Sequence, residues 1–187
     1  MMGALRPCFV LLLGVGLLAS LGCRDVRRPD GQTGLLPVGA EAPDVVGEGP
    51  SGETVRLSDV RGQVAAVYFY PKDGTPGCTK QACAFRDAYD RLEDAGVVVF
   101  GVSGDSVESH REFRKEHALP FPLVADESGE VARAYGVPTT LGMASRTTFL
   151  VGPDGRVVRV WPDVDPAVDA DRVLAAAGEL KSDRASE

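Results

Sequence analysis

Residues 64–83 decide the fold of this chain and read VAAVYFYPKDGTPGCTKQAC. The first seven residues are apolar or aromatic without interruption, which is typical of a strand buried on both faces of a sheet. The stretch TPG at 75–77 then opens a helical pattern that runs to about Ala95 and is closed by Gly96, with Thr75 as the expected N-cap. A buried strand followed directly by a helix is the start of an α/β unit.

The alternation of strand and helix patterns continues toward the C-terminus. The expected strands lie at 97–102, 121–125, 147–151 and 157–161. The expected helices lie at 105–118, 129–135 and 167–181. The last two strands form a hairpin that turns at PDG, 153–155. This order predicts an α/β three-layer domain with a central mixed β-sheet.

Composition narrows the classes of function. The chain has 187 residues, with 27 acidic against 20 basic side chains and a net charge of -7. No basic stripe is present to neutralise phosphates, so nucleic acid is not an expected partner. A hydrophobic content of 44% supplies enough core for one domain of this length without disulfides or structural metals. The four cysteines therefore call for another explanation.

The N-terminus accounts for two of these cysteines. After Arg6, the run from Cys8 to Gly22 is apolar and uncharged, and it is shorter than the roughly 20 residues that a spanning helix needs. It reads as an export signal. Its end, ASLGC at 19–23, resembles the lipobox of bacterial lipoproteins, in which the cysteine, here Cys23, is lipidated. The alternative is an ordinary signal peptide that leaves Cys23 as a free thiol.

These features divide the chain into four parts. Residues 1–22 are the predicted lipoprotein signal peptide, and 23–38 are a flexible tether rich in Pro, Gly and mixed charge. The domain is expected at 39–181, followed by a C-terminal tail at 182–187. The lipobox resemblance implies an exported protein of the bacterial cell envelope that is anchored to a membrane by lipid.

Cys78 and Cys83 remain as usable thiols. Cys78 lies in the first turn of the predicted helix, where free backbone N–H groups and the helix dipole favour thiolate over thiol and make a nucleophile. The alternative is a small buried hydrophobe. On an ideal helix the two Cα atoms are about 8.6 Å apart, beyond the disulfide limit near 7 Å. A metal site at the two cysteines would need further ligands, which the sequence does not supply nearby. The two histidines, His110 and His117, are expected to be solvated on a polar helix.

The residues around Cys78 resemble a known family. Pro71-x-x-x-Thr75-x-x-Cys78 matches the active-site signature of the peroxiredoxins, thiol peroxidases on a thioredoxin-like fold. The string YPKDGTPGCTKQAC is similar to the bacterioferritin comigratory protein branch, also called the Q type, over approximately residues 38–180. The resemblance implies reduction of hydrogen peroxide and organic hydroperoxides without a cofactor or metal.

The resemblance also implies roles for individual residues. Cys78 matches the peroxidatic cysteine, which we expect to be partly exposed, and Cys83 matches the resolving cysteine that forms an intramolecular disulfide after the helix unwinds locally. Thr75 matches the residue that hydrogen-bonds the peroxide, Pro71 the residue that shields the thiolate, and Arg146 the arginine before a later strand. The implied reductant is a thioredoxin-like dithiol protein, and the implied state is a monomer.

Two other functions compete with this interpretation. GVPTT at 136–140 imitates the Val-cis-Pro-Thr segment of thioredoxins and membrane-anchored thiol reductases, which suggests a thiol-disulfide oxidoreductase of the cell envelope. Those enzymes need C-x-x-C, which this sequence lacks, so Pro138 is expected to lie in a loop. The other alternative is a non-catalytic lipoprotein that kept the fold for binding, and the intact motif around Cys78 argues against it.

Overall fold

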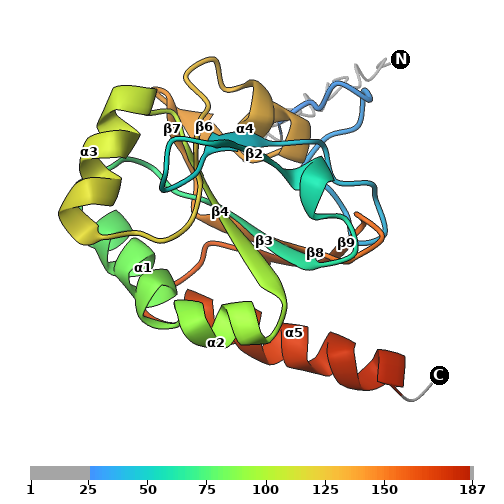
Figure 1. Cartoon of the computed structure of the whole chain (residues 1–187). Coiled ribbons are helices and arrows are strands. Elements are labelled where there is room, and N and C mark those ends of the chain that lie inside the picture. Colours follow the sequence, from blue (N-terminus) through green and yellow to red (C-terminus); the bar gives the residue numbers. More distant parts are fainter. Residues whose placement is uncertain (1–25, 186–187) are drawn as a thin grey trace, which may run out of the picture.

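A computed structural model describes residues 26–185 as a seven-stranded sheet between two layers of helices (Figure 1). The strands are β1 Val46–Glu48, β2 Thr54–Arg56, β3 Val64–Phe69, β4 Val97–Ser103, β5 Leu123–Ala125, β6 Thr139–Thr140, β7 Met143–Ala144, β8 Thr147–Val151 and β9 Val157–Pro162. The helices are α1 Pro76–Asp87, α2 Tyr89–Asp94, α3 Val107–His117, α4 Glu130–Tyr135 and α5 Asp169–Ala185, with a 3-10 turn at Leu57–Val60.

The seven-stranded sheet has the strand order β2-β1-β5-β4-β3-β8-β9, and the remaining strands β6 and β7 pair with each other as a separate two-stranded sheet. Strands β3, β4 and β5 are parallel, and β8 and β9 add an antiparallel hairpin beside β3. The predicted mixed sheet is therefore confirmed, as is the hairpin. Strand β3 pairs with β4 on one side and β8 on the other, and all six of its residues are buried, as its unbroken apolar sequence predicts.

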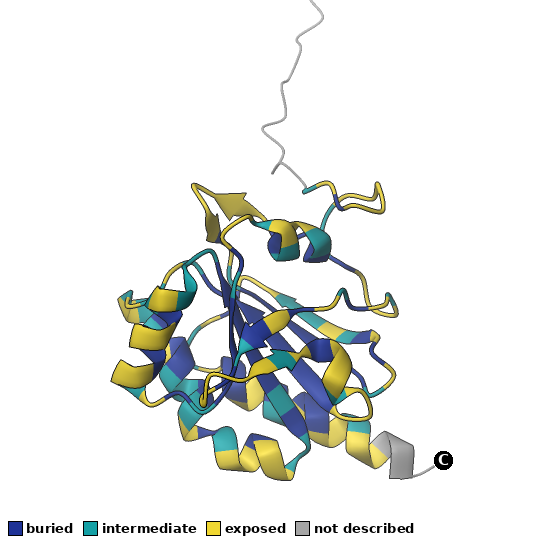
Figure 2. Cartoon of the chain, turned by 45° about the horizontal axis from the view of Figure 1, so that its top comes forward, coloured by how far each residue is buried: buried dark blue, intermediate teal, exposed yellow. Residues whose placement is uncertain are grey.

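The side chains of β3 alternate between two cores. Ala66 and Tyr68 face a cluster formed with α1, α2, α3 and α5, whereas Val67 and Phe69 face a cluster formed with α4 and the N-terminal segment. Buried residues follow the centre of the sheet in Figure 2. Phe113 and Leu119 point inward as expected. The three predicted layers are thus held together by two hydrophobic clusters with the sheet between them.

Several boundaries differ from the expected ones. The first predicted helix breaks at Ala88, which separates α1 from α2. The last helix begins at Asp169 and continues past Lys181 to Ala185, so the predicted tail at 182–187 is helical over its described part. Strands β1 and β2 were not expected, because strands of three residues carry too little periodicity to be recognised.

Residues 26–38 of the expected tether are described, and part of this segment contacts the domain. Arg28 is buried and donates to the carbonyl oxygens of Gly34 and Leu35 at 2.8 and 3.0 Å. The buried Leu36 donates its backbone N–H to Tyr135 O at 2.9 Å. Hydrogen bonds and apolar contacts therefore fix a segment whose composition alone resembles a linker.

The predicted signal peptide, 1–22, and the predicted lipidation site, Cys23, lie outside the described residues. Among residues 26–185, no helix has both the length and the apolar character needed to cross a membrane.

Candidate active site

Cys78 is the third residue of α1 and lies at the carboxyl end of β3, as its sequence position predicts. Its side chain is not partly exposed, because the residue is only 1% accessible. Arg146 Nη2 donates to Cys78 Sγ at 3.2 Å. The structure thus combines a helix N-terminus with a guanidinium at one sulfur atom, and both stabilise negative charge there.

Arg146 reaches the sulfur from the residue just before β8, although it lies 68 positions along the chain from Cys78. Its Nη1 donates to Gln81 Oε1 at 2.8 Å. Gly77 leaves space for this approach, since a Cβ atom there would lie 2.8 Å from Arg146 Nη2. The fork of one guanidinium therefore binds two residues of α1.

Gln81, which accepts from Arg146, also hydrogen-bonds a buried carboxyl group in the core. Its Nε2 donates to Asp169 Oδ2 at 2.7 Å, and Thr148 Oγ1 donates to the same oxygen at 2.8 Å. All three side chains are buried. Burial raises the pKa of Asp169, against the opposing effect of hydrogen bonds from Thr148 and Gln81. The sequence did not indicate Gln81 or Asp169 as site residues, because they lie 88 positions apart.

Thr75 and Pro71 belong to the loop that joins β3 to α1. Thr75 is the N-cap residue of α1, but its side chain makes no capping hydrogen bond. Its Oγ1 donates instead to Lys72 O at 3.0 Å, so the expected capping bond is wrong. Pro71 is half-buried beside the loop. Neither residue makes a hydrogen bond to the Cys78 sulfur among the described contacts.

A buried polar cluster fixes this loop from beneath. Asp73 accepts hydrogen bonds from Tyr70 Oη at 2.8 Å and Ser109 Oγ at 2.8 Å, and its Oδ2 lies 2.8 Å from His110 Nδ1. His110 Nε2 lies 3.2 Å from the Val124 carbonyl oxygen. The His110 ring therefore bridges the Asp73 carboxylate and the backbone of β5. The expectation that His110 is solvated is wrong, because its residue is 2% exposed.

Burial works to raise the pKa of Asp73, but hydrogen bonds from His110, Tyr70 and Ser109 lower it below its usual value. Its backbone N–H also donates to Asp105 Oδ2 at 2.8 Å. The cluster thus ties the loop before Cys78 to α3. His117 is half-buried against Phe113 rather than solvated.

Cys83 lies on the same helix as Cys78, and both are free thiols. Cys83 is half-buried, so it is more accessible than Cys78. The predicted exclusion of a bridge within the intact helix agrees with this state. Pro138 lies in a loop as expected, just before the two-residue strand β6.

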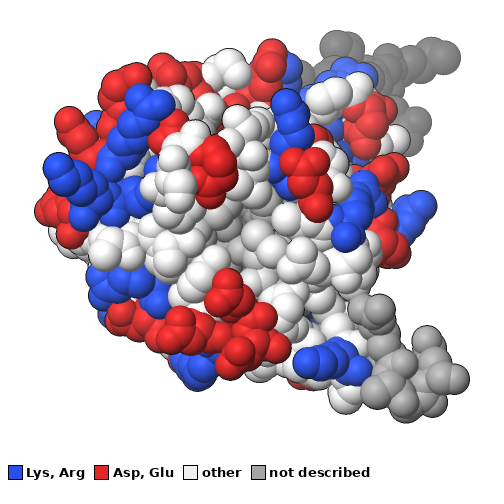
Figure 3. All heavy atoms as spheres, in the orientation of Figure 1, with Lys and Arg blue, Asp and Glu red and all other residues white. Residues whose placement is uncertain are grey.

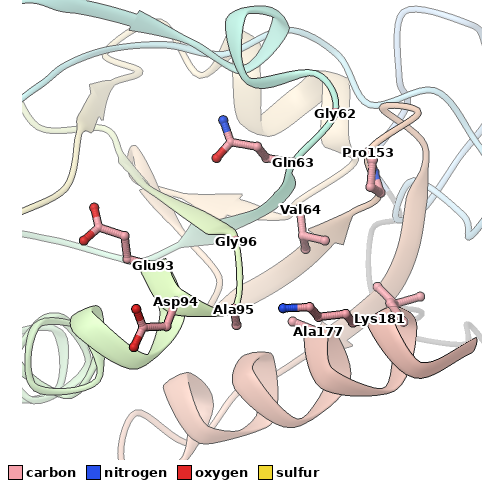
Figure 4. Close-up of a pocket in the computed structure, with 11 residues that line it drawn as sticks. Gly62, Gln63, Val64, Glu93, Asp94, Ala95, Gly96, Pro153, Ala177 and Lys181 are labelled. Carbon is pink, nitrogen blue, oxygen red and sulfur yellow. The ribbon is translucent and has the colours of Figure 1, made fainter. Parts of the chain in front are cut away.

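A cavity lies in another part of the structure. A cavity of about 480 Å³ lies at the opposite end of β3, between Gly96, Pro153 and the end of α5 (Figure 4). Glu93, Asp94 and Lys181 are its charged lining residues. On the face shown in Figure 3, Lys and Arg are interspersed with Asp and Glu. None of the residues that line this cavity is a cysteine, and Cys78 lies at the other end of β3.

Comparison with known proteins identifies the family. The model of the AhpC/TSA family matches residues 38–160. The chain belongs to the AhpC/TSA family. It is 41% identical over 137 residues to peroxiredoxin Bcp of Bacillus subtilis, covering 69% of this chain and 87% of that protein. It is 42% identical over 146 residues to chloroplastic peroxiredoxin Q of Sedum lineare, covering 76% of this chain and 78% of that protein.

Solved structures agree with this AhpC/TSA assignment. Peroxidoxin BcpB from Mycobacterium tuberculosis has a TM-score of 0.71 and 31% identity, covering 77% of this chain and 97% of that chain. A structure of the bacterioferritin comigratory protein of Xanthomonas campestris has a TM-score of 0.68 and 34% identity, with 76% and 98% covered. The fold is therefore thioredoxin-like, and the chain is a peroxiredoxin of the BCP/PrxQ branch, a thiol peroxidase that reduces peroxides.

Proposed function

We propose that Cys78 is the nucleophile of this thiol peroxidase. The observation that carries the assignment is the 3.2 Å contact from Arg146 Nη2 to Cys78 Sγ at the start of α1. The thiolate attacks the distal peroxide oxygen, an S–O bond forms and the O–O bond breaks. The sulfur is oxidised to sulfenic acid, and the leaving oxygen takes a proton and departs as water or alcohol.

Arg146 stabilises the charge that this step creates. Negative charge moves from sulfur onto both peroxide oxygens, so a fixed cation beside the sulfur stabilises the transition state more than the ground state. Thr75 supplies a hydroxyl that hydrogen-bonds the peroxide, and Pro71 shields the thiolate from water. The same geometry serves hydrogen peroxide and organic hydroperoxides, because all of them present the O–O bond.

Cys83 is the resolving residue in this proposal. Its thiol displaces the hydroxyl group of the Cys78 sulfenic acid, which yields a disulfide and water. Both residues belong to the continuous helix α1, so the segment between them has to unwind before the sulfur atoms meet. A thioredoxin-like dithiol protein then reduces the disulfide and restores both thiols, and the enzyme acts as a monomer.

We further propose that the protein is lipid-anchored through Cys23 in the bacterial cell envelope. The apolar run before Cys23 supports this proposal. The position of Val26 bears on where such an anchor would hold the domain. Val26 lines a hollow with Ser145 and Thr147, the two neighbours of Arg146. Three residues span at most roughly 11 Å, so the anchor would hold the active-site end of the sheet near the membrane.

One experiment tests the enzymatic part of the proposal. Peroxide consumption is followed for the wild type and for Cys78→Ser, with a panel of dithiol proteins as electron donors. We expect turnover with a thioredoxin-like donor and none in Cys78→Ser. Turnover by Cys78→Ser at the wild-type rate would remove Cys78 from the reaction.

The anchor is tested separately by mass spectrometry of the N-terminus. We expect the protein from membranes to begin at an acylated Cys23, and Cys23→Ala to remain uncut and without lipid. An unmodified Cys23 at the wild-type N-terminus would show that the signal is an ordinary one.

A further inference from the structure

The amide of Gln81 is bound at both ends. Its Oε1 accepts from Arg146 Nη1 at 2.8 Å, and its Nε2 donates to Asp169 Oδ2 at 2.7 Å. A guanidinium only donates and a carboxylate oxygen accepts, so the amide has one orientation that satisfies both partners. Gln81 therefore transmits the position of Asp169 to the guanidinium that contacts Cys78 Sγ.

Asp169 is an unusual residue to find in a core. It is the first residue of α5 and is fully buried. Its Oδ2 accepts from Gln81 and from Thr148, while its Oδ1 has no hydrogen-bond partner in the described part of the chain. A buried carboxylate with an unpartnered oxygen costs stability, and a role in the reaction would explain why the chain carries it.

The contacts of Asp169 form a closed circuit. Thr148 belongs to β8, the strand that begins just after Arg146. The path from Arg146 through Gln81, Asp169 and Thr148 thus returns to the strand that carries the guanidinium. These hydrogen bonds join three elements, α1, β8 and α5. The residue of α1 that takes part, Gln81, lies between the two cysteines.

We propose that Asp169 is a positioning residue of the peroxidase, and that with Gln81 it forms a clamp on α1. The clamp holds Arg146 against Cys78 Sγ for the reaction with peroxide, and it holds α1 closed until Cys83 is needed. This proposal rests on the proposed roles of Cys78 and Cys83.

The clamp acts on the two steps of the reaction in opposite directions. A fixed Arg146 accelerates the first step, because its guanidinium is already in place when the O–O bond breaks. Gln81 lies between Cys78 and Cys83, so unwinding of this segment has to break the Gln81 to Asp169 bond. A tight clamp therefore slows disulfide formation and gives a second peroxide more time to oxidise the sulfenic acid to sulfinic acid.

The test compares Asp169→Ala with Asp169→Asn in the full chain. Rapid quenching with an alkylating reagent, followed by peptide mapping, measures the thiol, disulfide and sulfinic forms of Cys78 over time. In Asp169→Ala we expect oxidation of Cys78 to slow by about 10- to 100-fold, disulfide formation to accelerate, and less sulfinic acid per turnover. Asp169→Asn is expected to recover most of the change, because its carbonyl oxygen still accepts from Gln81 and Thr148.

Val173→Ala is the matched control. Val173 is fully buried on the same helix and makes none of the clamp contacts. It should lower thermal stability through a cavity while leaving both rates at their wild-type values. Slower Cys78 oxidation together with faster disulfide formation in Asp169→Ala, but not in Val173→Ala, would therefore distinguish loss of the clamp from general loosening of α5.

Wild-type values for both rates in Asp169→Ala would overturn the proposal, and so would an Asp169→Asn variant as impaired as Asp169→Ala. If Asp169→Ala does not fold, Gln81→Met decides by the same two rates, since it removes both amide bonds at similar volume. The first step is also measured in Cys83→Ser. If the oxidised wild type forms no Cys78 to Cys83 disulfide, Cys83 does not resolve Cys78, and the proposal that the clamp holds α1 closed is refuted. The rate of Cys78 oxidation in the Cys83→Ser chain still tests whether the clamp positions Arg146.

Discussion

Replacement of Gly77 by Ala should slow peroxide reduction without destabilising the fold. The added methyl group would lie 2.8 Å from Arg146 Nη2, the atom that donates to Cys78 Sγ at 3.2 Å. Non-bonded heavy atoms stay about 3.5 Å apart, so the guanidinium has to withdraw by about 0.7 Å. Because a shift of about 1 Å at a reacting group costs about 100-fold in rate, we expect a loss of about 10- to 100-fold.

The stability of this variant should move in the other direction. Gly77 is the second residue of α1 and its φ is not positive, so Ala fits the backbone. Ala is more favourable than Gly by about 0.8–1.0 kcal/mol in a helix interior, and the first turn gains part of that. Gly178→Ala in α5 is the matched control, because a methyl group there meets nothing within 4 Å. It should gain stability and keep the wild-type rate.

Stopped-flow measurement of Cys78 oxidation by peroxide and urea unfolding are required for all three proteins. A wild-type rate in Gly77→Ala would refute the use of the Arg146 contact in the reaction. A joint loss of rate and stability would contradict the reasoning as well, since it would show that the methyl group damages α1 instead of displacing Arg146.

Three further predictions follow from the same contacts. Arg146→Lys keeps the charge but loses the guanidinium fork that contacts Cys78 and Gln81. Competition kinetics should therefore show that the rate constant for peroxide falls by roughly 10- to 1,000-fold. An unchanged rate constant would remove Arg146 from the site. Cys83→Ser should keep the first oxidation, form no intramolecular disulfide and overoxidise Cys78 at lower peroxide, as peptide mapping would show, whereas full turnover with a dithiol donor would place resolution elsewhere. Because hydrogen bonds from His110 and its neighbours outweigh burial and lower the pKa of Asp73, the stabilising effect of the carboxylate is present above about pH 3.9, its unfolded value. It is lost as pH falls through the lower folded value, so the stability difference between wild type and Asp73→Asn in urea unfolding should shrink there, and a difference independent of pH would contradict this sign.

Local sequence was sufficient for the elements that build the core. Strand β3 and strand β4 were predicted within a residue of their ends, because strands buried on both faces are apolar throughout. The start of α1 was also predictable, since the stretch TPG at 75–77 opens the helical pattern. Cys78 and Arg146 were singled out by motif, and the structure brings them together at 3.2 Å.

Contacts between distant polar residues were not predictable in the same way. His110 lies on a helix whose composition is polar, and its burial is explained by partners elsewhere in the chain, Asp73 and the Val124 carbonyl oxygen. Gln81 and Asp169 have no local pattern that distinguishes them from surface residues, because their bond is a tertiary one. The burial of Arg28 depends on the carbonyl oxygens of Gly34 and Leu35, which only the folded segment brings within reach of the guanidinium.

The most direct test of the central claim is peptide mapping of Cys78 in the Cys83→Ser chain after one equivalent of peroxide, with a reagent that traps sulfenic acid. We predict that Cys78 carries one molecule of the trapping reagent, attached where the sulfenic acid formed, and that the thiol lost equals the peroxide consumed. Consumption of peroxide with the Cys78 thiol intact would contradict the assignment of this residue as the nucleophile.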